Sequence, residues 1–327
     1  MTDYILPRLG SKALTTLASS DIRRAFADIA QQTSRRGGTL SWYRQRNIWR
    51  VFSMVLTAAE RAGYIARNPM RRMRAPSAPN VRNAADSAVI ESPRLRALSA
   101  EEVRRVMAHA ETLGTQALVR WHLGLYVGLR QSECLGIVWD NVKVSRNEIL
   151  IDRQLYRQAW MHGCDDDSCG RRPASCPSRH GGGLRVVRTT KTNQIRTVPI
   201  TDDIAQGLSN LYEEQQEQRA EAGERWQEQR DWKNLVFRRP WGAPISPSDD
   251  WRQWQEMTQT VLGRRARVHD ARHSSATLMI DAGAPLTAVR DVLGHSRIDM
   301  TSRYVGTASE AAHDAIRAVT RSLSGRG

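Results

Sequence analysis

The chain of 327 residues contains no uninterrupted run of about 18 apolar residues, which is the length needed to cross a bilayer as a helix. Its first residues, MTDYILPRLG, lack the basic-then-apolar layout of a secretory signal peptide. No repeat period occurs along the chain, which excludes the common repeat architectures. These absences lead us to expect a soluble protein that stays in the cytoplasm.

Cysteine is also scarce, with only 4 residues in the chain. In a protein that is not expected to be exported, cysteines are better explained as free thiols or metal ligands than as disulfides. Three of the four lie close together, and Cys134 stands apart from them in an apolar stretch. We expect Cys134 to belong to the core.

Negative charge is in short supply, because 34 Asp and Glu face 49 Lys and Arg, for a net charge of +15. Most of the excess is arginine, whose planar fork matches phosphate oxygens. Nucleic acid is therefore the first partner to expect, and an anionic membrane surface is the second.

The patterning predicts two domains, each long enough to bury a core. Residues 1–75 read as helical, with Ile22, Phe26 and Ile29 at helical spacing and a second helix whose apolar face contains Ile48, Val51, Phe52, Val55 and Leu56. The remaining face of this second helix and the segment after it are almost purely basic, which predicts a DNA-binding surface. The candidate DNA-binding residues are Arg44, Arg46, Arg50, Arg71, Arg72 and Arg74.

Residues 76–97 contain three prolines and no sustained period, so we expect an interdomain linker. The second domain, residues 98–327, begins at a capping box formed by Ser99 and Glu102. An apolar helix broken near Gly128 follows, then three strands of one small sheet in NEILIDRQLYRQ, GLRVVRTTKT and QIRTVPI, and a long exposed helix over TDDIAQGLSNLYEEQQEQRAEAGERW. The expected fold is mainly α with a small β-sheet (α+β).

The second domain carries residues suited to phosphodiester chemistry, each beside a predicted break in a helix or hairpin. Such chemistry needs a nucleophile, cations on the nonbridging oxygens and an acid for the leaving oxygen. His269 and Arg272 are one helical turn apart, so both can face one ligand. The remaining candidates are Arg130, Lys191, His295 and Tyr304.

In their order and surroundings, GLRQSE, TKTNQIRTVPI, HDARHSSAT, LGHS and SRY resemble the motifs of tyrosine recombinases of the phage-integrase family. The resemblance covers residues 98–310 closely and residues 1–75 more loosely. It implies a site-specific DNA recombinase, with a helical core-binding domain and a mostly α catalytic domain that clamp DNA.

The resemblance also implies a role for each residue. Tyr304 would attack the phosphate to give a 3′-phosphotyrosine, while Arg130 and Arg272 clamp the nonbridging oxygens. Lys191 would protonate the leaving oxygen, His269 would act as general acid or base, and His295 would donate a hydrogen bond to the phosphate. Glu133 would orient the site, and we expect His273 to be structural. Transesterification conserves the bond energy, so we expect no cofactor for catalysis.

Three functions remain open at this point. The first is a phage or mobile-element integrase, which would act as a homotetramer on attachment sites in double-stranded DNA, with accessory DNA-bending or directionality proteins, in a bacterial cell. The second is a chromosome or plasmid dimer resolvase with the same chemistry. The third is a DNA-binding regulator that has lost turnover.

Between two predicted strands, an insertion at residues 162–183 holds Cys164, Cys169, Cys176 and His180, separated by four, six and three residues. Three thiolates and an imidazole make a complete tetrahedral zinc set, and a loop of this length with little apolar content is otherwise hard to order. We therefore expect a structural zinc site. The alternative is a flexible, cysteine-bearing insertion without a metal. His162 is a spare candidate ligand.

The two ends of the chain leave further alternatives. No room exists before YILPRLG for an arm-binding domain, so the enzyme is either naturally short or a truncated form. Near the other end, SEAAHDAIRAVTRSL predicts an amphipathic helix with Ile316, Val319 and Leu323 on one stripe. That helix would pack either on its own domain or on a neighbouring protomer.

Overall fold

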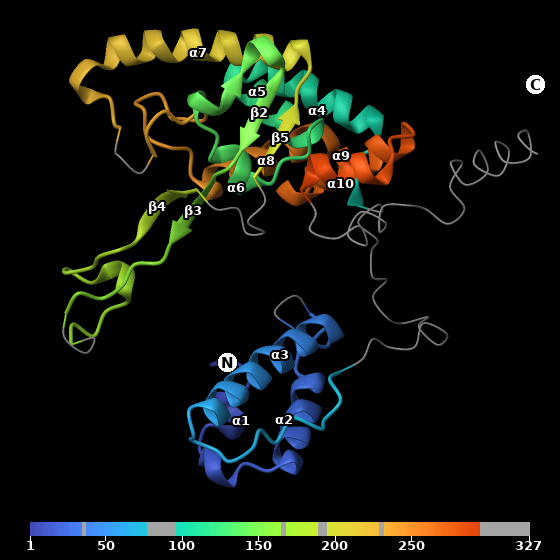
Figure 1. Ribbon diagram of the computed structural model, residues 1–327, viewed down its shortest axis with the longest axis vertical. Coiled ribbons are helices and arrows are strands. Elements are labelled where there is room, and N and C mark those ends of the chain that lie inside the picture. The colour runs from blue at the N-terminus through green and yellow to red at the C-terminus, as the bar shows by residue number, and fades with distance from the viewer. Residues whose placement is uncertain (35–36, 77–95, 165–167, 189–194, 229–231, 295–327) are drawn as a thin grey trace, which may run out of the picture. The chain divides into compact units, whose positions relative to one another are not determined.

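The computed structural model describes residues 1–34, 37–76, 96–164, 168–188, 195–228 and 232–294. The chain divides into two compact units, residues 1–90 and 91–327 (Figure 1). Most of the predicted linker, residues 76–97, lies outside the described residues, so its limits stay a prediction. The fold is mainly α with small antiparallel sheets, as the sequence predicts.

The first unit is helical and has its own core. Its helices are α1 (Leu6–Leu9), α2 (Ser19–Gln31) and α3 (Trp42–Arg61). Ile22, Phe26 and Ile29 of α2 are buried, as their spacing predicts, and they belong to the same apolar cluster as Phe52 and Leu56 of α3. The ring centroids of Phe26 and Trp49 lie 4.8 Å apart in an edge-to-face arrangement.

The predicted apolar face of α3 is partly wrong. Val51 and Val55 are exposed, whereas Ile48, Phe52 and Leu56 are buried. These three residues repeat every four positions and form one narrow stripe along the helix. Val51 and Val55 each lie one position before a residue of that stripe, on a side of the helix that stays exposed.

The second unit contains seven of the described α-helices. They are α4 (Ala100–Thr112), α5 (Thr115–Leu125), α6 (Gln131–Leu135), α7 (Asp202–Ala222), α8 (Pro247–Leu262), α9 (Val268–Asp281) and α10 (Leu286–Leu293). The predicted capping box opens α4: Ser99 Oγ accepts from the Glu102 N–H at 3.2 Å, and a Glu102 carboxylate oxygen accepts from the Ser99 N–H at 2.9 Å. The chain turns between α5 and α6 at Gly128, where φ is +74°.

The β structure differs from the single small sheet predicted from the sequence. The strands are β1 (Val142–Lys143), β2 (Glu148–Ile151), β3 (Gln154–Gln158), β4 (Gly183–Val187) and β5 (Arg196–Pro199). One antiparallel sheet has the order β1-β2-β5, and a separate antiparallel ribbon pairs β3 with β4. The ribbon projects from the helical body in Figure 1.

The predicted strand NEILIDRQLYRQ is therefore two strands, β2 and β3, separated at Asp152 and Arg153. Asp152 is nearly fully buried, and one of its carboxylate oxygens accepts a hydrogen bond from Asn141 Nδ2 at 2.5 Å. Arg153 and Arg188 pair with the same carboxylate. These polar contacts hold the chain where it passes from the sheet to the ribbon.

Helix α7 lies where the sequence predicts it but ends earlier, at Ala222, and it is only half exposed. Ile204, Leu208 and Leu211 are buried and join the core that contains Ile149 of β2. Their spacing of four and three residues places them on one face of the helix, and that face packs on α5. Most of the Gln and Glu residues of the helix are exposed, whereas Gln215 is buried and donates to the carbonyl oxygen of Val236.

A buried ion pair joins α5 to α8. Arg120 donates from Nε and Nη2 to the two carboxylate oxygens of Asp250, at 2.7 and 2.9 Å. Gln131, next to Arg130 in the chain, donates to the same carboxylate at 2.8 Å. A second apolar cluster surrounds the pair, in which the rings of Trp121 and Trp254 lie 4.3 Å apart. The start of α6 is therefore fixed to the body of the second unit.

None of the helices in the described ranges is both long and apolar enough to cross a membrane.

We predict that Asp250→Ala destabilises the second unit by about 3–5 kcal/mol, because it leaves the buried guanidinium of Arg120 without its carboxylate. Asp249→Ala is the matched control on the same helix. Asp249 pairs with the exposed side chains of Arg239 and Arg252, so its loss should cost about 1 kcal/mol or less. Urea denaturation followed by circular dichroism measures both. Equal losses in the two variants would contradict the prediction.

Candidate active site and nucleic-acid interface

Three arginine side chains meet at the C-terminal end of α10. Arg196 Nε donates to the carbonyl oxygen of Val292 at 2.9 Å, Arg272 Nη2 to that of Leu293 at 2.7 Å, and Arg130 Nη2 to that of Gly294 at 3.0 Å. The last carbonyls of a helix lack intrahelical partners and carry partial negative charge. Three successive carbonyls therefore hold one arginine each.

Glu133 connects two of these arginines. One of its carboxylate oxygens lies 2.6 Å from Arg130 Nη1, and the other lies 2.8 Å from Arg196 Nη2. The Glu133 side chain is 1% exposed and that of Arg130 is 24% exposed, so the carboxylate lies beneath the guanidinium group. Glu133 also accepts from the backbone N–H of Arg130 and caps α6.

The surroundings of Glu133 keep it ionised. Burial by itself would raise its pKa, but the hydrogen bond from Arg196 and the charges of Arg196, Arg130 and Arg272 outweigh burial and lower the pKa to about 2. A buried carboxylate with two guanidinium partners is charged throughout the physiological pH range. It offsets part of the repulsion among the arginines.

Arg272 also contacts the chain break at Gly128. Its Nη1 donates to the carbonyl oxygen of Gly128 at 2.7 Å, and the side chain is 2% exposed. A Cβ at Gly128 would lie 2.6 Å from the Leu293 side chain and 2.8 Å from Ser275 Oγ. Only glycine fits there, with its positive φ and the close approach of α9 and α10.

His269 lies one turn before Arg272 on α9, at the accessible surface. Partial burial by the surrounding protein, together with the charges of Arg272 and Arg130, lowers its pKa. Its ring stands edge-to-face with that of His273, with centroids 4.5 Å apart. Burial and the neighbouring His269 and Arg267 lower the pKa of His273 to about 3. Both imidazoles are therefore neutral near pH 7, and a neutral His269 can accept a proton.

Three of the predicted catalytic residues, Lys191, His295 and Tyr304, lie outside the described residues, as does the predicted helix containing Ile316, Val319 and Leu323. Gly294, which directly precedes His295, contacts Arg130 through its carbonyl oxygen. Arg130, Glu133 and Arg272 are brought together as described above.

Arg196 belongs to this cluster, although the sequence analysis did not single it out. The signal for it lies in QIRTVPI, where Arg196 falls on the same face of β5 as the fully buried Val198. A charged residue on the buried face of a strand needs a partner, and Glu133 is that partner. A Cβ at Gly294 would lie 2.7 Å from the Arg196 guanidinium, so this guanidinium also fits closely against the turn after α10.

The cluster as a whole is a fixed group of cations next to a neutral imidazole. Such a group can hold an oxyanion by charge-assisted hydrogen bonds and can accept or return a proton beside it. Carbonyl groups and a carboxylate already fix the arginine side chains. Binding an anion therefore costs little further side-chain conformational entropy.

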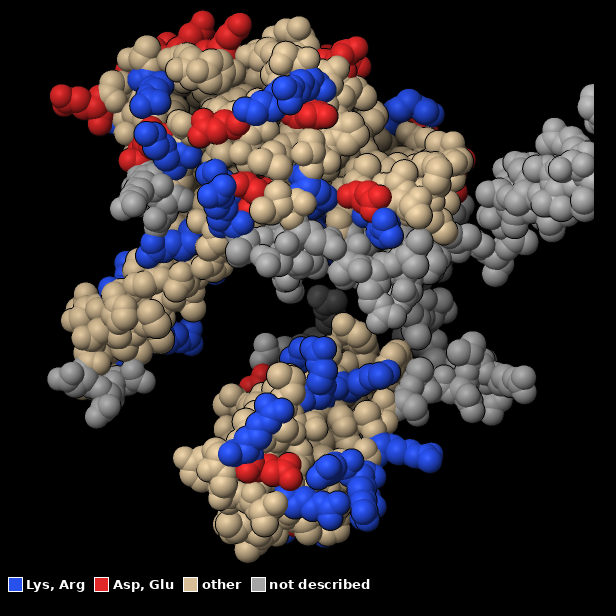
Figure 2. Space-filling model, in the orientation of Figure 1, with Lys and Arg blue, Asp and Glu red and all other residues tan. Residues whose placement is uncertain are grey.

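The candidate DNA-binding arginines of the first unit are all exposed. Figure 2 shows Lys and Arg gathered on the visible face of this unit, with few acidic side chains among them. Arg44 lies over the ring of Tyr4 at 5.4 Å. A hollow beside α3 is lined by Arg46 and Arg50 together with aromatic side chains. The exposed set is Arg44, Arg46, Arg50, Arg71, Arg72 and Arg74.

The cysteine-bearing insertion brings His162 together with Cys164, Cys169 and Cys176; His180 is not one of these four. The four potential ligand atoms lie within 4.8 Å of one another. His180 instead pairs with Met161 through the backbone, with hydrogen bonds of 3.0 and 3.1 Å. This pairing extends the ribbon beyond β3 and β4 and leaves the imidazole of His180 exposed. The fourth cysteine, Cys134, is fully buried in the core of the second unit.

Comparison with known proteins identifies the family. The model of the phage integrase family matches residues 96–311. The chain belongs to the phage integrase family. The match includes Arg130, Glu133 and Arg272, which converge in the structure, and also Lys191 and Tyr304.

Curated members of the phage integrase family resemble the chain over most of its length. An integrase of Saccharopolyspora erythraea is 28% identical over 286 residues, which cover 78% of this chain and 61% of the relative. A tyrosine recombinase XerC-like protein of Caldanaerobacter subterraneus is 26% identical over 242 residues, or 73% of this chain and 56% of the relative. The chain thus spans about three fifths of the length of these relatives.

Solved structures of other proteins have the same fold as this chain. The integrase of transposon Tn1549 in complex with transposon right end DNA has a TM-score of 0.67 at 17% identity, covering 97% of this chain and 89% of that one. A lambda integrase dimer bound to a core site has a TM-score of 0.56 at 13% identity, covering 94% and 89%.

We predict that Glu133 makes stability depend on pH in acid. Its folded pKa of about 2 lies below the ordinary value of about 4.3, so its contribution is complete above pH ~4.5 and is lost as the pH falls through ~2. The contribution is on the order of 3 kcal/mol. The difference in unfolding free energy between the wild type and Glu133→Gln should therefore shrink between pH 5 and pH 2.

Urea denaturation at a series of pH values measures this difference, and Glu101→Gln serves as control because Glu101 is an exposed carboxylate whose pair with Arg104 lies at the surface. A Glu133→Gln difference that stays constant down to about pH 2 would contradict the assigned ionisation.

Proposed function

We propose that the protein is a site-specific DNA recombinase that cuts and rejoins duplex DNA through a 3′-phosphotyrosine at Tyr304. The observation that carries the proposal is the convergence of Arg130 and Arg272, with Arg196 and Glu133, at the end of α10. Membership of the phage integrase family supports it.

In this proposal, Arg130 and Arg272 bind the nonbridging oxygens of the scissile phosphate. Arg130 is the more accessible of the two, whereas Arg272 is almost fully buried. Glu133 holds Arg130 in place, Arg196 fixes Glu133, and neither Glu133 nor Arg196 touches the substrate in this proposal. A bidentate guanidinium clamp matches both the charge and the geometry of the phosphate in the transition state.

His269, neutral at physiological pH, is suited to accept the proton of the attacking tyrosine hydroxyl and to return it in the reverse step. A tyrosine hydroxyl has an ordinary pKa of about 10, so it needs a base or nearby cations to react at neutral pH. Lys191 would protonate the leaving 5′-oxygen, and His295 would donate to the phosphate. The bond energy is kept in the phosphotyrosine, so no cofactor is required for this chemistry.

We propose double-stranded DNA as the partner, bound by both the helical unit and the catalytic unit. The net charge of +15 and the exposed arginines of the first unit support this proposal. The similar Tn1549 and lambda integrase structures hold DNA. We further propose that four protomers join two sites, with accessory DNA-bending or directionality proteins, in the cytoplasm of a bacterial host.

The dimer-resolvase alternative has the same chemistry, and curated relatives named XerC and XerD match shorter parts of the chain. We favour the integrase reading because an integrase matches 286 residues of the chain, whereas the XerC-like protein of Caldanaerobacter subterraneus matches 242 and the XerD protein of Halalkalibacterium halodurans matches 70.

The first test uses nicked duplexes that tile the DNA flanking the protein's own gene. The nick releases a short fragment after cleavage, so the covalent complex cannot religate and is trapped. We predict a covalent protein–DNA band on a denaturing gel for the wild type, its complete loss in Tyr304→Phe, and its retention in Tyr212→Phe. Tyr212 lies on α7 against Trp139, within the same unit but outside the cluster.

Binding of the same duplexes in a mobility-shift assay separates the alternatives. Tyr304→Phe should bind as the wild type does, since the hydroxyl is needed only for chemistry. Sequence-specific binding without any covalent band, in the wild type as in Tyr304→Phe, would refute the recombinase and favour the DNA-binding regulator.

A further inference from the structure

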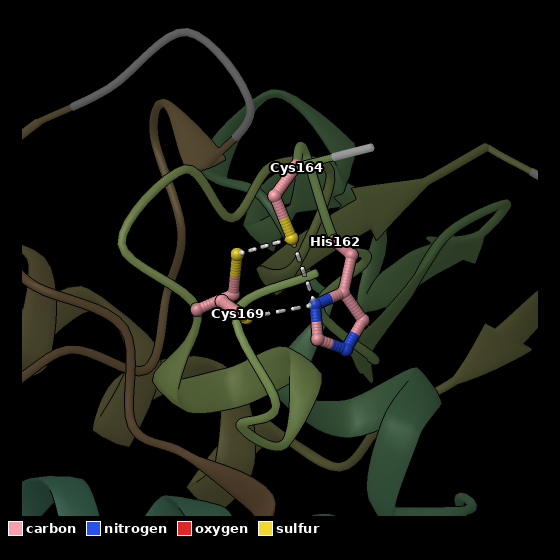
Figure 3. A group of neighbouring side chains, drawn as sticks. His162, Cys164 and Cys169 are labelled. Atoms are coloured by element: carbon pink, nitrogen blue, oxygen red, sulfur yellow. Dashed lines mark hydrogen bonds between the residues drawn. The ribbon is translucent and has the colours of Figure 1, made fainter. Parts of the chain in front are cut away.

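The end of the β3–β4 ribbon is built around side chains that the proposed recombination chemistry does not use. Beyond β3 and β4, the pairing of Met161 with His180 carries the ribbon outward to the segment that holds His162 and three cysteines. Figure 3 shows the side chains of His162 and Cys164, which come from one stretch of the loop, pointing toward Cys169.

The distances within this group are those of ligands around one ion. Cys164 Sγ and Cys169 Sγ each lie 3.6 Å from His162 Nδ1, and Cys176 Sγ lies 3.7 Å from Cys164 Sγ. In a tetrahedral zinc site the metal lies about 2.3 Å from sulfur and about 2.0–2.1 Å from nitrogen. These bond lengths place two sulfurs about 3.8 Å apart, and a sulfur and a nitrogen about 3.6 Å apart. Three of the six pairs of ligand atoms thus already lie at the edge lengths of such a tetrahedron, and all four atoms lie within 4.8 Å of one another.

We propose that His162, Cys164, Cys169 and Cys176 bind one structural zinc ion. Three thiolates and one imidazole are a ligand set of structural zinc, and four protein ligands leave no position open for a substrate. The site therefore stabilises the ribbon and takes no part in phosphate chemistry.

Other uses of the cysteines fit the geometry less well. A disulfide needs two sulfurs at about 2.05 Å, whereas Cys164 and Cys176 are 3.7 Å apart and all three cysteines are free. An iron–sulfur cluster places several atoms between its thiolates, whereas these ligand atoms all lie within 4.8 Å of one another. That space suits a single ion, and the thiolates favour zinc over the hard cations.

The loop around the group is held close enough to keep this geometry. A Cβ at Gly163, between His162 and Cys164, would lie 2.0 Å from the carbonyl oxygen of Ser178, so only glycine allows the two segments to meet. Cys176 is nearly fully buried and follows a short 3-10 helix, η7 (Pro173–Ser175). The local packing brings the ligands together from both sides of the loop.

Apolar packing alone offers little to hold this end of the ribbon. Trp160 lies beside Gly182 and under the guanidinium of Arg179, whose carbon is 4.7 Å from the ring centroid, and it is only partly buried. The base of the ribbon is different, because Leu155 of β3 is fully buried in the core of the second unit. A metal ion is the usual means by which a small segment with few apolar side chains keeps one conformation.

The experiment begins with zinc content, measured by plasma mass spectrometry on the full-length protein purified from zinc-containing medium under reducing conditions. We expect one zinc per chain in the wild type, and loss of most of it in Cys164→Ser, Cys169→Ser, Cys176→Ser and His162→Ala. His180→Ala and Cys134→Ser are the matched controls and should keep the metal. Retention by His162→Ala with loss in His180→Ala would overturn the ligand set.

Cobalt(II) then reports the coordination directly. Replacement of zinc should give the intense visible bands of tetrahedral cobalt and the near-ultraviolet bands of thiolate ligation. His162→Cys should restore a tetrahedral spectrum with a stronger thiolate band, which His162→Ala lacks. A weak octahedral spectrum in the wild type would refute a closed thiolate site.

A third measurement applies to the wild type and so does not depend on any variant folding. Alkylation with iodoacetamide, read by mass spectrometry, should spare Cys164, Cys169 and Cys176 in the zinc form and modify them after chelation, while buried Cys134 stays unmodified in both forms. Modification that is equally fast before and after chelation would overturn the proposal. The outcome is independent of the recombinase assay, because no catalytic step uses these residues.

Discussion

The C-terminal end of α10 is the point at which the proposed catalytic cluster is assembled. Its last carbonyls accept from Arg196 of β5, Arg272 of α9 and Arg130 at the start of α6. Three elements from different parts of the chain are therefore fixed to one helix end. The arrangement satisfies carbonyls that a helix end leaves without partners, and the partial negative charge of that end favours the three cations.

Glu133 stabilises this dense group of cations electrostatically. Three guanidinium groups in close proximity repel one another, and a buried carboxylate between two of them offsets part of that repulsion. The carboxylate does not neutralise the group, so the cluster remains positive overall. A phosphate arriving at it would complete a charge balance that the folded protein leaves open, which is how a preorganised site lowers the cost of a developing negative charge.

The two ends of the β3–β4 ribbon are held in one conformation by different interactions. At the base, Leu155 is buried and Asp152 is fixed by hydrogen bonds and ion pairs, so the hydrophobic core of the second unit holds the strands. At the far end, the core is out of reach, and the close approach of Gly163 to Ser178 positions sulfur and nitrogen atoms instead. In the proposed zinc form, metal–ligand bonds take over the role that apolar burial has at the base.

The local signals in the sequence determined a large part of the fold. Helical spacing gave α2, the capping box located the start of α4, and Gly128 marked a chain break with positive φ. The spacing of His269 and Arg272 also placed them one turn apart, because helix geometry depends only on neighbours in the chain.

Only the tertiary structure decided which distant residues meet. Arg196 and Glu133 are 63 residues apart in the chain, and no local pattern relates them. The replacement of His180 by His162 in the proposed ligand set has the same origin, because the backbone pairing of His180 with Met161 fixes which imidazole faces the sulfurs. Likewise, the sequence predicts that NEILIDRQLYRQ is extended. The break at Asp152 depends on its partners Asn141 and Arg188, which lie outside that stretch. Periodicity is a property of neighbouring residues, whereas pairing is decided by the free energy of the whole fold.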